Sequence, residues 1–204
     1  MELRVMPACA PLRSRLSVVT TGFGTEDDAV ASQKDMRTVV ILIGVLQLQA
    51  GVGDQIPKLA AKPLSGGEVR LPGGAKIAAY VLSFGFSSKC DKAVAAWDKR
   101  IAPVYSSDPR VAYYEIPVLE GLPGLIRPLV LHGMRRVIPK ADQTRFAPVF
   151  EGETALKNIV GFQDPDAAYV VVATGSGKVV WTSHAPASEA AFAELRKSVS
   201  EILR

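Results

Sequence analysis

The feature that most limits the fold of this chain is an uncharged apolar run, AAYVLSFGF, at positions 78–86. A strand that is apolar on both faces is typical of a sheet covered by helices on both sides. The run leads directly into a segment with apolar residues at helical spacing, and Pro103 is expected to end this helix. Its apolar face comprises Ala93, Val94, Trp97 and Ile101. These features predict an α/β domain built around one central strand.

The remaining segments supply further strands and helices. Residues 110–119 read as a second core strand, and residues 168–183 as two strands joined by a Gly-Ser-Gly turn. An earlier hairpin is expected around Ser65–Gly67, a short edge-like piece at 145–150, a short helix at 153–162, and a closing helix capped by Ser188.

A further helix is expected within residues 125–139, with its first turn near Pro128. Its apolar positions share one stripe, which we expect to face the core. They are Leu125, Ile126, Leu129, Val130, Met134 and Val137.

The order of these elements predicts the fold class. A parallel strand pair joined by a helix, followed by an antiparallel hairpin and a closing helix, is a thioredoxin-like arrangement. We therefore expect an α/β, three-layer sandwich with a central mixed sheet and an N-terminal β-hairpin, formed by residues 51–204.

The first fifty residues do not resemble the domain. Residues 1–35 have no sustained periodicity and are interpreted as a disordered or untranslated extension. The segment Met36–Ala50 has a basic start, an apolar run and a small residue at its end, which is the layout of a secretory signal peptide. We expect an exported protein, periplasmic or membrane-associated; an uncleaved anchor, a core element and a targeting segment for the mitochondrial inner membrane remain alternatives.

Charge and cysteine content narrow the possible partners. The net charge is +4, and a mild excess of this kind fits an acidic protein or an anionic membrane surface better than nucleic acid. Of the two cysteines, Cys9 would be lost with a leader, so Cys90 would remain alone without a disulfide. The two histidines have no metal-ligand spacing, and no cofactor or metal is predicted.

Two linked segments carry a family resemblance: GMRRVIPKADQTRF, from Gly133, and NIVGFQDPDAAYVVVATGSGKVVWTSHAPASEAAFAEL, from Asn158. They are similar to the mitochondrial ATPase complex subunit ten family, assembly factors for the membrane sector of F-type ATP synthase. The matching positions are Gly133, Arg135, Arg136, Ile138, Pro139, Tyr169, Gly177, Val179 and Trp181. More broadly, most of residues 54–204 resembles the thioredoxin-like superfamily, including its exported TlpA-type and peroxiredoxin-type members. The resemblance implies an assembly role with a protein partner, with a membrane protein as its client.

Cys90 is the candidate catalytic residue, because it lies in the first turn of the helix after the central strand, beside the capping residues Ser87 and Ser88. The helix dipole and the neighbouring lysines predict a lowered thiol pKa. However, no second cysteine completes a Cys-x-x-Cys pair, and Ala168 occupies the register in which thioredoxin-like redox enzymes place a proline. A packing cysteine, a reactive single thiol and a metal ligand are the three readings.

The strongest charge feature is a basic cluster around the helix within 125–139. It comprises Arg127, His132, Arg135, Arg136, Lys140 and Arg145. The cluster is either the solvated face of this helix or an electrostatic docking surface for carboxylate or phosphate groups.

Two functions follow from these observations. In the first, a thioredoxin-like protein without a redox pair serves as a non-catalytic binding or assembly factor, similar to a chaperone, for a membrane-associated protein. In the second, Cys90 acts alone as the nucleophile of a thiol oxidoreductase or peroxidase.

Overall fold

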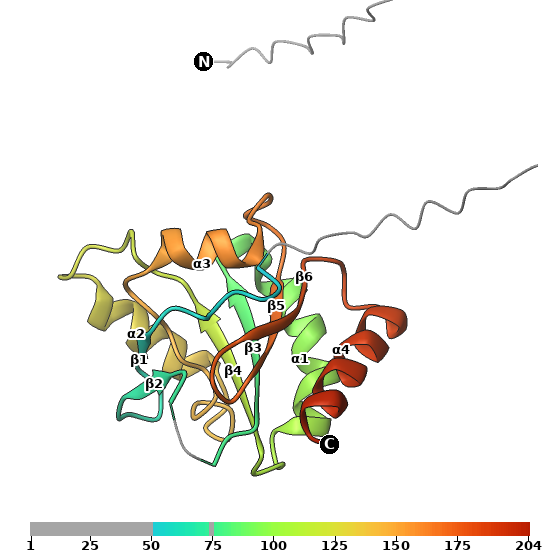
Figure 1. The fold of residues 1–204 in the computed structure, drawn as a ribbon. Helices are drawn as coiled ribbons and strands as arrows, with labels where there is room; N and C mark the ends of the chain where they lie inside the picture. The colour runs from blue at the N-terminus through green and yellow to red at the C-terminus, as the bar shows by residue number, and fades with distance from the viewer. Residues whose placement is uncertain (1–50, 74–75) are drawn as a thin grey trace, which may run out of the picture. The chain divides into compact units, whose positions relative to one another are not determined.

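The computed structural model describes residues 51–73 and 76–204 (Figure 1). The extension expected at 1–35 and the leader expected at 36–50 lie outside the described residues. Within the part of the chain that is described, no helix combines the length and apolar character needed to cross a bilayer.

A four-stranded mixed sheet forms the centre of the domain, in the order β4-β3-β5-β6 (Figure 1). The apolar run forms the inner strand β3 (Ala79–Gly85), which pairs in parallel with β4 (Val111–Pro117) and antiparallel with β5 (Tyr169–Thr174). Strand β6 (Val179–Ser183) completes the hairpin with β5. The expected N-terminal hairpin is a separate sheet of β1 (Leu59–Ala61) and β2 (Val69–Leu71). The predicted thioredoxin-like fold class is confirmed.

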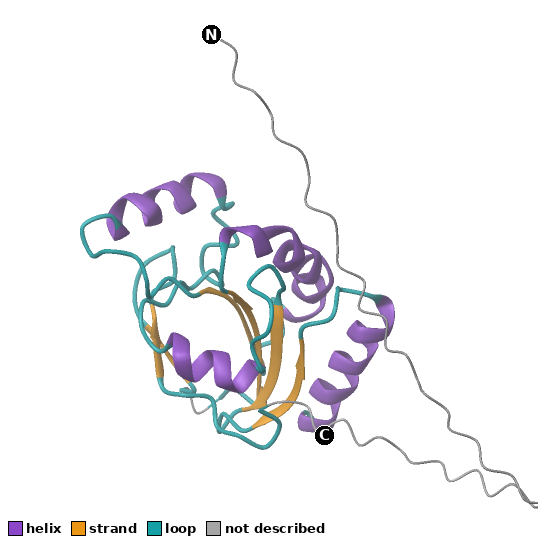
Figure 2. Ribbon diagram, turned by 90° about the horizontal axis from the view of Figure 1, so that it is seen from above, coloured by secondary structure: helices purple, strands orange, loops and turns teal. Residues whose placement is uncertain are grey.

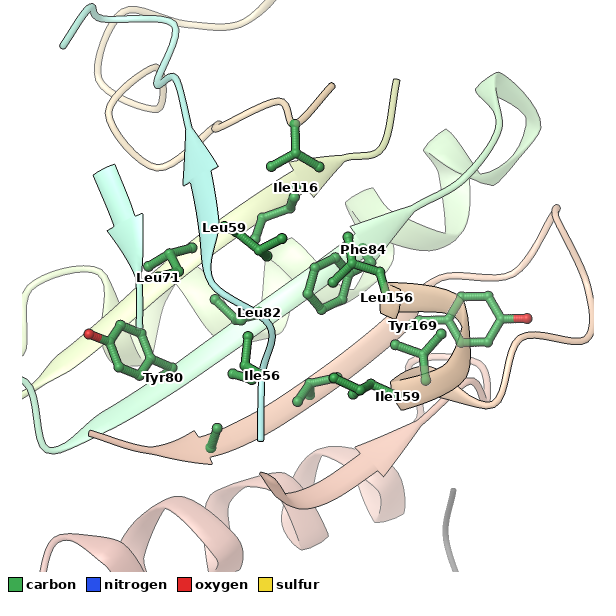
Figure 3. Close-up of a cluster of buried hydrophobic side chains, with 14 of the residues drawn as sticks. Ile56, Leu59, Leu71, Tyr80, Leu82, Phe84, Ile116, Leu156, Ile159 and Tyr169 are labelled. Carbon is green, nitrogen blue, oxygen red and sulfur yellow. The ribbon is translucent and has the colours of Figure 1, made fainter. Parts of the chain in front are cut away.

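Helices cover both faces of the sheet (Figure 2). One face packs against α1 (Asp91–Tyr105) and α4 (Glu189–Ile202), and the other against α3 (Glu153–Val160) and the β1–β2 hairpin. Because side chains alternate along a strand, β3 contributes Val81 to the first layer and Leu82 to the second. Figure 3 shows the second layer, in which Leu156 of α3 lies near Phe84.

The segment at residues 145–149 extends the sheet beyond β4. The backbone N–H of Glu115 donates to the carbonyl of Arg145 at 2.9 Å, and that of Ala147 donates to the carbonyl of Glu115 at 2.8 Å. The backbone N–H of Val149 continues the ladder to Pro117 at 3.0 Å. The edge-like piece expected at 145–150 is therefore present, and it covers the edge of β4.

The expectation that Pro103 ends its helix is wrong, because α1 continues to Tyr105. Proline has no backbone N–H and so removes one intrahelical hydrogen bond, but Pro103 lies in the last turn of α1, and only the final hydrogen bonds of the helix follow it. The helix still closes with the N–H of Ser106 donating to Ala102 at 3.1 Å.

The expected core face of the next helix is also wrong. Helix α2 (Arg127–Val137) begins beside Pro128 as predicted, but it buries none of its residues. Leu129 and Val137 of the apolar stripe are 71% and 80% exposed. The physical reason is that the sheet face is already closed by α3 and the β1–β2 hairpin, so α2 has no apolar surface left to cover.

Candidate functional site

The candidate site begins where β3 ends. After Gly85 the chain forms a short 3-10 turn, η1 (Ser88–Cys90), which continues as α1. The side chain of Ser87 caps this turn by accepting a hydrogen bond from the N–H of Lys89 at 3.0 Å. Of the two serines proposed as caps, Ser87 has this role, whereas Ser88 is the first residue of the turn itself.

Cys90 faces the interior at this junction and is only 2% exposed. Its Sγ donates to the carbonyl of Ser87 at 2.9 Å. A Cβ atom added to Gly85 would lie 2.7 Å from Sγ, so the end of β3 packs directly on the sulfur. The thiol therefore fills a site in the core and is withdrawn from solvent.

Burial raises the pKa of the Cys90 thiol, and the negative charge of Asp91 raises it further. The hydrogen bond to the Ser87 backbone opposes this shift but does not outweigh the desolvation of the thiolate. The expectation of a lowered pKa is therefore wrong, because it considered the helix start and the lysines but not the depth of the sulfur. At neutral pH the thiol is protonated and inert.

The position of Cys90 relative to Ser87 explains the missing partner. Two residues separate them, as in a Cys-x-x-Cys motif, and Ser87 lies at the half-exposed capping position. Cys90 thus occupies the inner position of such a motif, and a serine stands at the outer one. Cys90 is the one cysteine in residues 51–73 and 76–204, so no second thiol is within reach there.

The loop before β5 packs against the start of α1. Lys89 Nζ lies 3.9 Å from Asp166 Oδ2, and Ser87 Oγ donates to Asp166 Oδ1 at 3.5 Å. The residue that directly precedes β5 is the buried Ala168. Asp166 was not predicted as a site residue, since nothing in the sequence links it to a turn almost eighty positions away.

Aromatic rings extend this region. Phe86, directly after β3, makes edge-to-face contacts with Phe162 and Tyr169, with ring centroids 5.1 and 5.5 Å apart. The exposed His184 lies with its ring centroid 5.9 Å from that of Tyr169. We name this region the helix-end surface, defined by Phe86, Ser87, Lys89, Phe162, Asp166 and His184.

The structure divides the predicted basic cluster. Arg127, Arg135 and Arg136 lie on α2, and Lys140 follows that helix as an exposed residue. Arg135 Nε donates to the carbonyl of Leu64 at 2.9 Å, and Arg127 Nε donates to the carbonyl of Leu122 at 3.0 Å. His132 and Arg136 are also exposed.

Arg145 does not belong to this exposed face, because it points into a network of acids. Its Nη2 donates to Asp98 Oδ1 at 2.9 Å and its Nη1 donates to Asp142 Oδ1 at 2.6 Å. Arg145 Nε lies 3.8 Å from Glu115 Oε1, and Tyr113 donates to Asp98 Oδ1 at 3.1 Å. Arg145 is therefore engaged by acids of its own chain and lies apart from the exposed residues of the predicted cluster. One signal of the network was available in the sequence: Glu115 is a charged residue inside an apolar strand.

Glu115 is the most strongly perturbed acid of this network. Burial raises its pKa to about 8, and the negative charge of Asp98 acts in the same direction. Arg145 lowers the pKa, but one guanidinium cannot compensate three carboxylates. Glu115 is therefore mostly protonated at neutral pH.

The chain is similar to several solved structures, although its sequence matches no family model and no curated protein. A candidate protein disulfide isomerase from Bacteroides thetaiotaomicron aligns with a TM-score of 0.52 and 18% identity, over 76% of this chain and 94% of that one. A candidate electron transfer protein from Aquifex aeolicus VF5 aligns with a TM-score of 0.52 and 14% identity, over 75% of this chain and 98% of that one.

A third similar structure is the pneumococcal exposed lipoprotein thioredoxin from Streptococcus pneumoniae strain TIGR4, with a TM-score of 0.48 and 16% identity, over 69% of this chain and 98% of that one. At such identities, similarity indicates a shared fold and not shared chemistry. The chain has the thioredoxin-like fold.

Cys90 should react slowly with iodoacetamide in the full chain carrying Cys9→Ser, with a reaction midpoint above about pH 8.5. The reason is that Sγ is buried and its thiolate is desolvated. Labelling followed by mass spectrometry across pH measures this, with the Cys9→Ser, Cys90→Ser chain as blank and the urea-unfolded protein as the accessible reference. Fast labelling with a midpoint well below 8 would contradict the buried thiol.

The free energy of unfolding of Glu115→Gln should rise relative to that of the unsubstituted chain when the pH is raised from 5 to 8. Because the folded-state pKa is raised, the folded protein binds more protons than the unfolded chain between about pH 4.5 and 8, and stability falls as pH rises through this window. The relative gain should be roughly 2–4 kcal/mol between pH 5 and 8, measured by urea unfolding. Exposed Glu201→Gln is the control, and an equal pH dependence of the two variants would refute the assignment.

Proposed function

We propose that this protein is a non-catalytic binding module of thioredoxin-like fold that acts as an assembly factor for a membrane-associated protein partner. The observation that carries the proposal is the burial of Cys90 behind a serine at the outer position of the motif. The resemblance to ATP synthase assembly factors suggests the membrane sector of F-type ATP synthase as the client.

The arrangement around Cys90 argues against thiol–disulfide exchange. Exchange begins with the attack of an accessible thiolate, and a second thiol then resolves the mixed disulfide. The Cys90 thiol has a raised pKa and lies beneath Gly85, so the first step is disfavoured. Ser87 cannot form a disulfide, so the second step has no intramolecular route through that position.

The helix-end surface offers contacts for a polypeptide in place of a reactive sulfur. It presents partly exposed aromatic rings, Phe86 and Phe162, beside the exposed charges of Lys89 and Asp166. Aromatic residues surrounded by polar groups are a frequent composition of protein interfaces. The loop before β5 is held to η1 by Asp166, so this surface is largely formed before a partner binds.

A single-thiol oxidoreductase is the second candidate, since Cys90 does lie at the start of α1 beside Lys89. Helix starts and lysines stabilise thiolates when the sulfur is accessible. In the described conformation Sγ is not accessible, and a reactive thiol would require η1 to open. The alkylation measurement described above separates the two functions.

Ser87→Cys should confer dithiol activity that the unsubstituted protein lacks. The new thiol would stand three residues before Cys90, whose Sγ already contacts the Ser87 carbonyl at 2.9 Å. We expect an intramolecular disulfide and insulin reduction with dithiothreitol well above the unsubstituted rate. Ser88→Cys is the matched control, one position out of register. Insulin reduction by the unsubstituted protein at the rate of a dithiol enzyme would refute the proposed function.

Client binding should depend on the helix-end surface. The double variant Lys89→Ala, His184→Ala removes two exposed side chains from it, and we expect an affinity loss of about tenfold for the purified membrane sector of F-type ATP synthase in detergent. Interferometry on the immobilised full chain measures this, with Lys99→Ala, Lys197→Ala as a control of equally exposed residues elsewhere. No binding of the membrane sector by the unsubstituted protein would refute the ATP synthase assignment.

A further inference from the structure

Helix α2 and the loop before it carry the most exposed apolar side chains of the described residues. Leu125 is 96% exposed, Val137 80% and Leu129 71%, and Ile126 is also exposed. Isolated exposed apolar residues are ordinary, but four within thirteen positions form a patch. Such patches mark surfaces that are covered by a protein or by a membrane.

The same stretch of chain is strongly basic. Residues 121–141 contain no Asp or Glu, and four basic residues lie among them. They are Arg127, Arg135, Arg136 and Lys140. The local charge of this stretch is therefore +4, which equals the net charge of the whole chain. An exposed patch that is both apolar and acid-free matches an anionic, partly apolar surface.

The outward stripe of α2 combines the two properties along its length. Leu129, His132 and Arg136 follow one another at intervals of three and four residues, so they lie on one side of the helix, and the exposed Leu125 stands in the turn just before it. The leucines come first and Arg136 follows near the end of the helix. The opposite side of the helix holds the half-buried Met134.

Although α2 buries no residue, its position is fixed by hydrogen bonds. Arg135 Nε donates to the carbonyl of Leu64 at 2.9 Å, and Gln143 Nε2 donates to the carbonyls of Arg135 and Ile138 at 3.0 Å each. These bonds hold the outward stripe in a defined orientation while its side chains are uncovered.

We propose that α2 docks on the surface of a lipid bilayer that carries anionic headgroups. Leu129 in the first turn of α2 and Leu125 just before the helix would enter the boundary between headgroups and acyl chains, while the arginines would remain among the phosphates. The observations favour a bilayer over an acidic protein because the leucines protrude into solvent, and a fluid surface accommodates protruding side chains without a complementary pocket. This docking goes beyond the proposed client binding and does not depend on it, since it uses a different surface.

A fluorescent probe on α2 tests the proposal in the full chain. An environment-sensitive NBD label is attached through Leu129→Cys in a chain carrying Cys9→Ser and Cys90→Ser, and phosphatidylglycerol or phosphatidylcholine vesicles are added. We expect a blue shift and quenching by spin-labelled lipid with phosphatidylglycerol only. Arg136→Gln, Lys140→Gln should weaken binding about ten- to thirtyfold, from roughly a factor of five per cation.

Two controls keep the result specific to α2. The same label at Val104→Cys, a 45% exposed site on α1, should not respond to vesicles. Lys99→Gln, Lys197→Gln removes the same charge elsewhere and should retain the response of the label at position 129.

Three results would overturn the proposal. The first is an equal fluorescence shift of the labels at positions 129 and 104. The second is binding of the vesicles to the chain without a shift of the label at position 129. The third is a shift of that label with soluble polyglutamate but not with vesicles. The last result would assign α2 to an acidic protein. Because client binding is measured separately in detergent through Lys89 and His184, failure of one proposal leaves the other intact.

Discussion

The burial of β3 on both faces is the constraint on which the rest of the domain depends. Its side chains alternate between two helical layers, so Val81 and Leu82 contact opposite sides of the core. Because β3 is covered by α1 on one face, the chain must turn into that helix directly at Gly85, and the first inward residue of the turn is Cys90. The burial of the thiol is thus a result of strand and helix packing.

The same geometry places a thioredoxin-like helix start beside a thiol that is withdrawn from solvent. The start of α1, the loop before β5 and the aromatic rings between them lie together, with Ser87 at the outer motif position and Ala168 directly before β5. Lys89 and Asp166 are charged side chains that remain accessible beside this junction. A shared fold does not carry shared chemistry, so the proposed recognition of a polypeptide at this junction does not require a reactive thiol.

Local patterns in the sequence predict most of the fold, since the uncharged run of β3, the Gly-Ser-Gly turn and the Ser188 cap each depend on neighbouring residues. The predictions that proved wrong have a common cause: they depend on which segments cover the core, and local sequence patterns do not determine this. The stripe of α2 has the period of a buried face, yet α3 and the β1–β2 hairpin already cover the sheet, so Leu129 is left outside. Likewise, the depth of Cys90 depends on the contact with Gly85, which a helix-start argument does not include.

The loop after α2 connects the buried and the exposed parts of the basic cluster. Within it, Arg145 turns inward to Asp98 and Asp142, while Gln143 donates to the carbonyls of Arg135 in α2 and of Ile138 directly after the helix. The inward ion pairs hold the loop against α1 and β4, and the loop in turn orients α2. Arg145 therefore contributes to the exposed basic face without lying on it: it positions the helix that carries Arg136. Loss of its guanidinium would leave Asp98 and Asp142 without this partner and would remove one of the anchors of the loop, while α2 would keep the bond from Arg135 to Leu64.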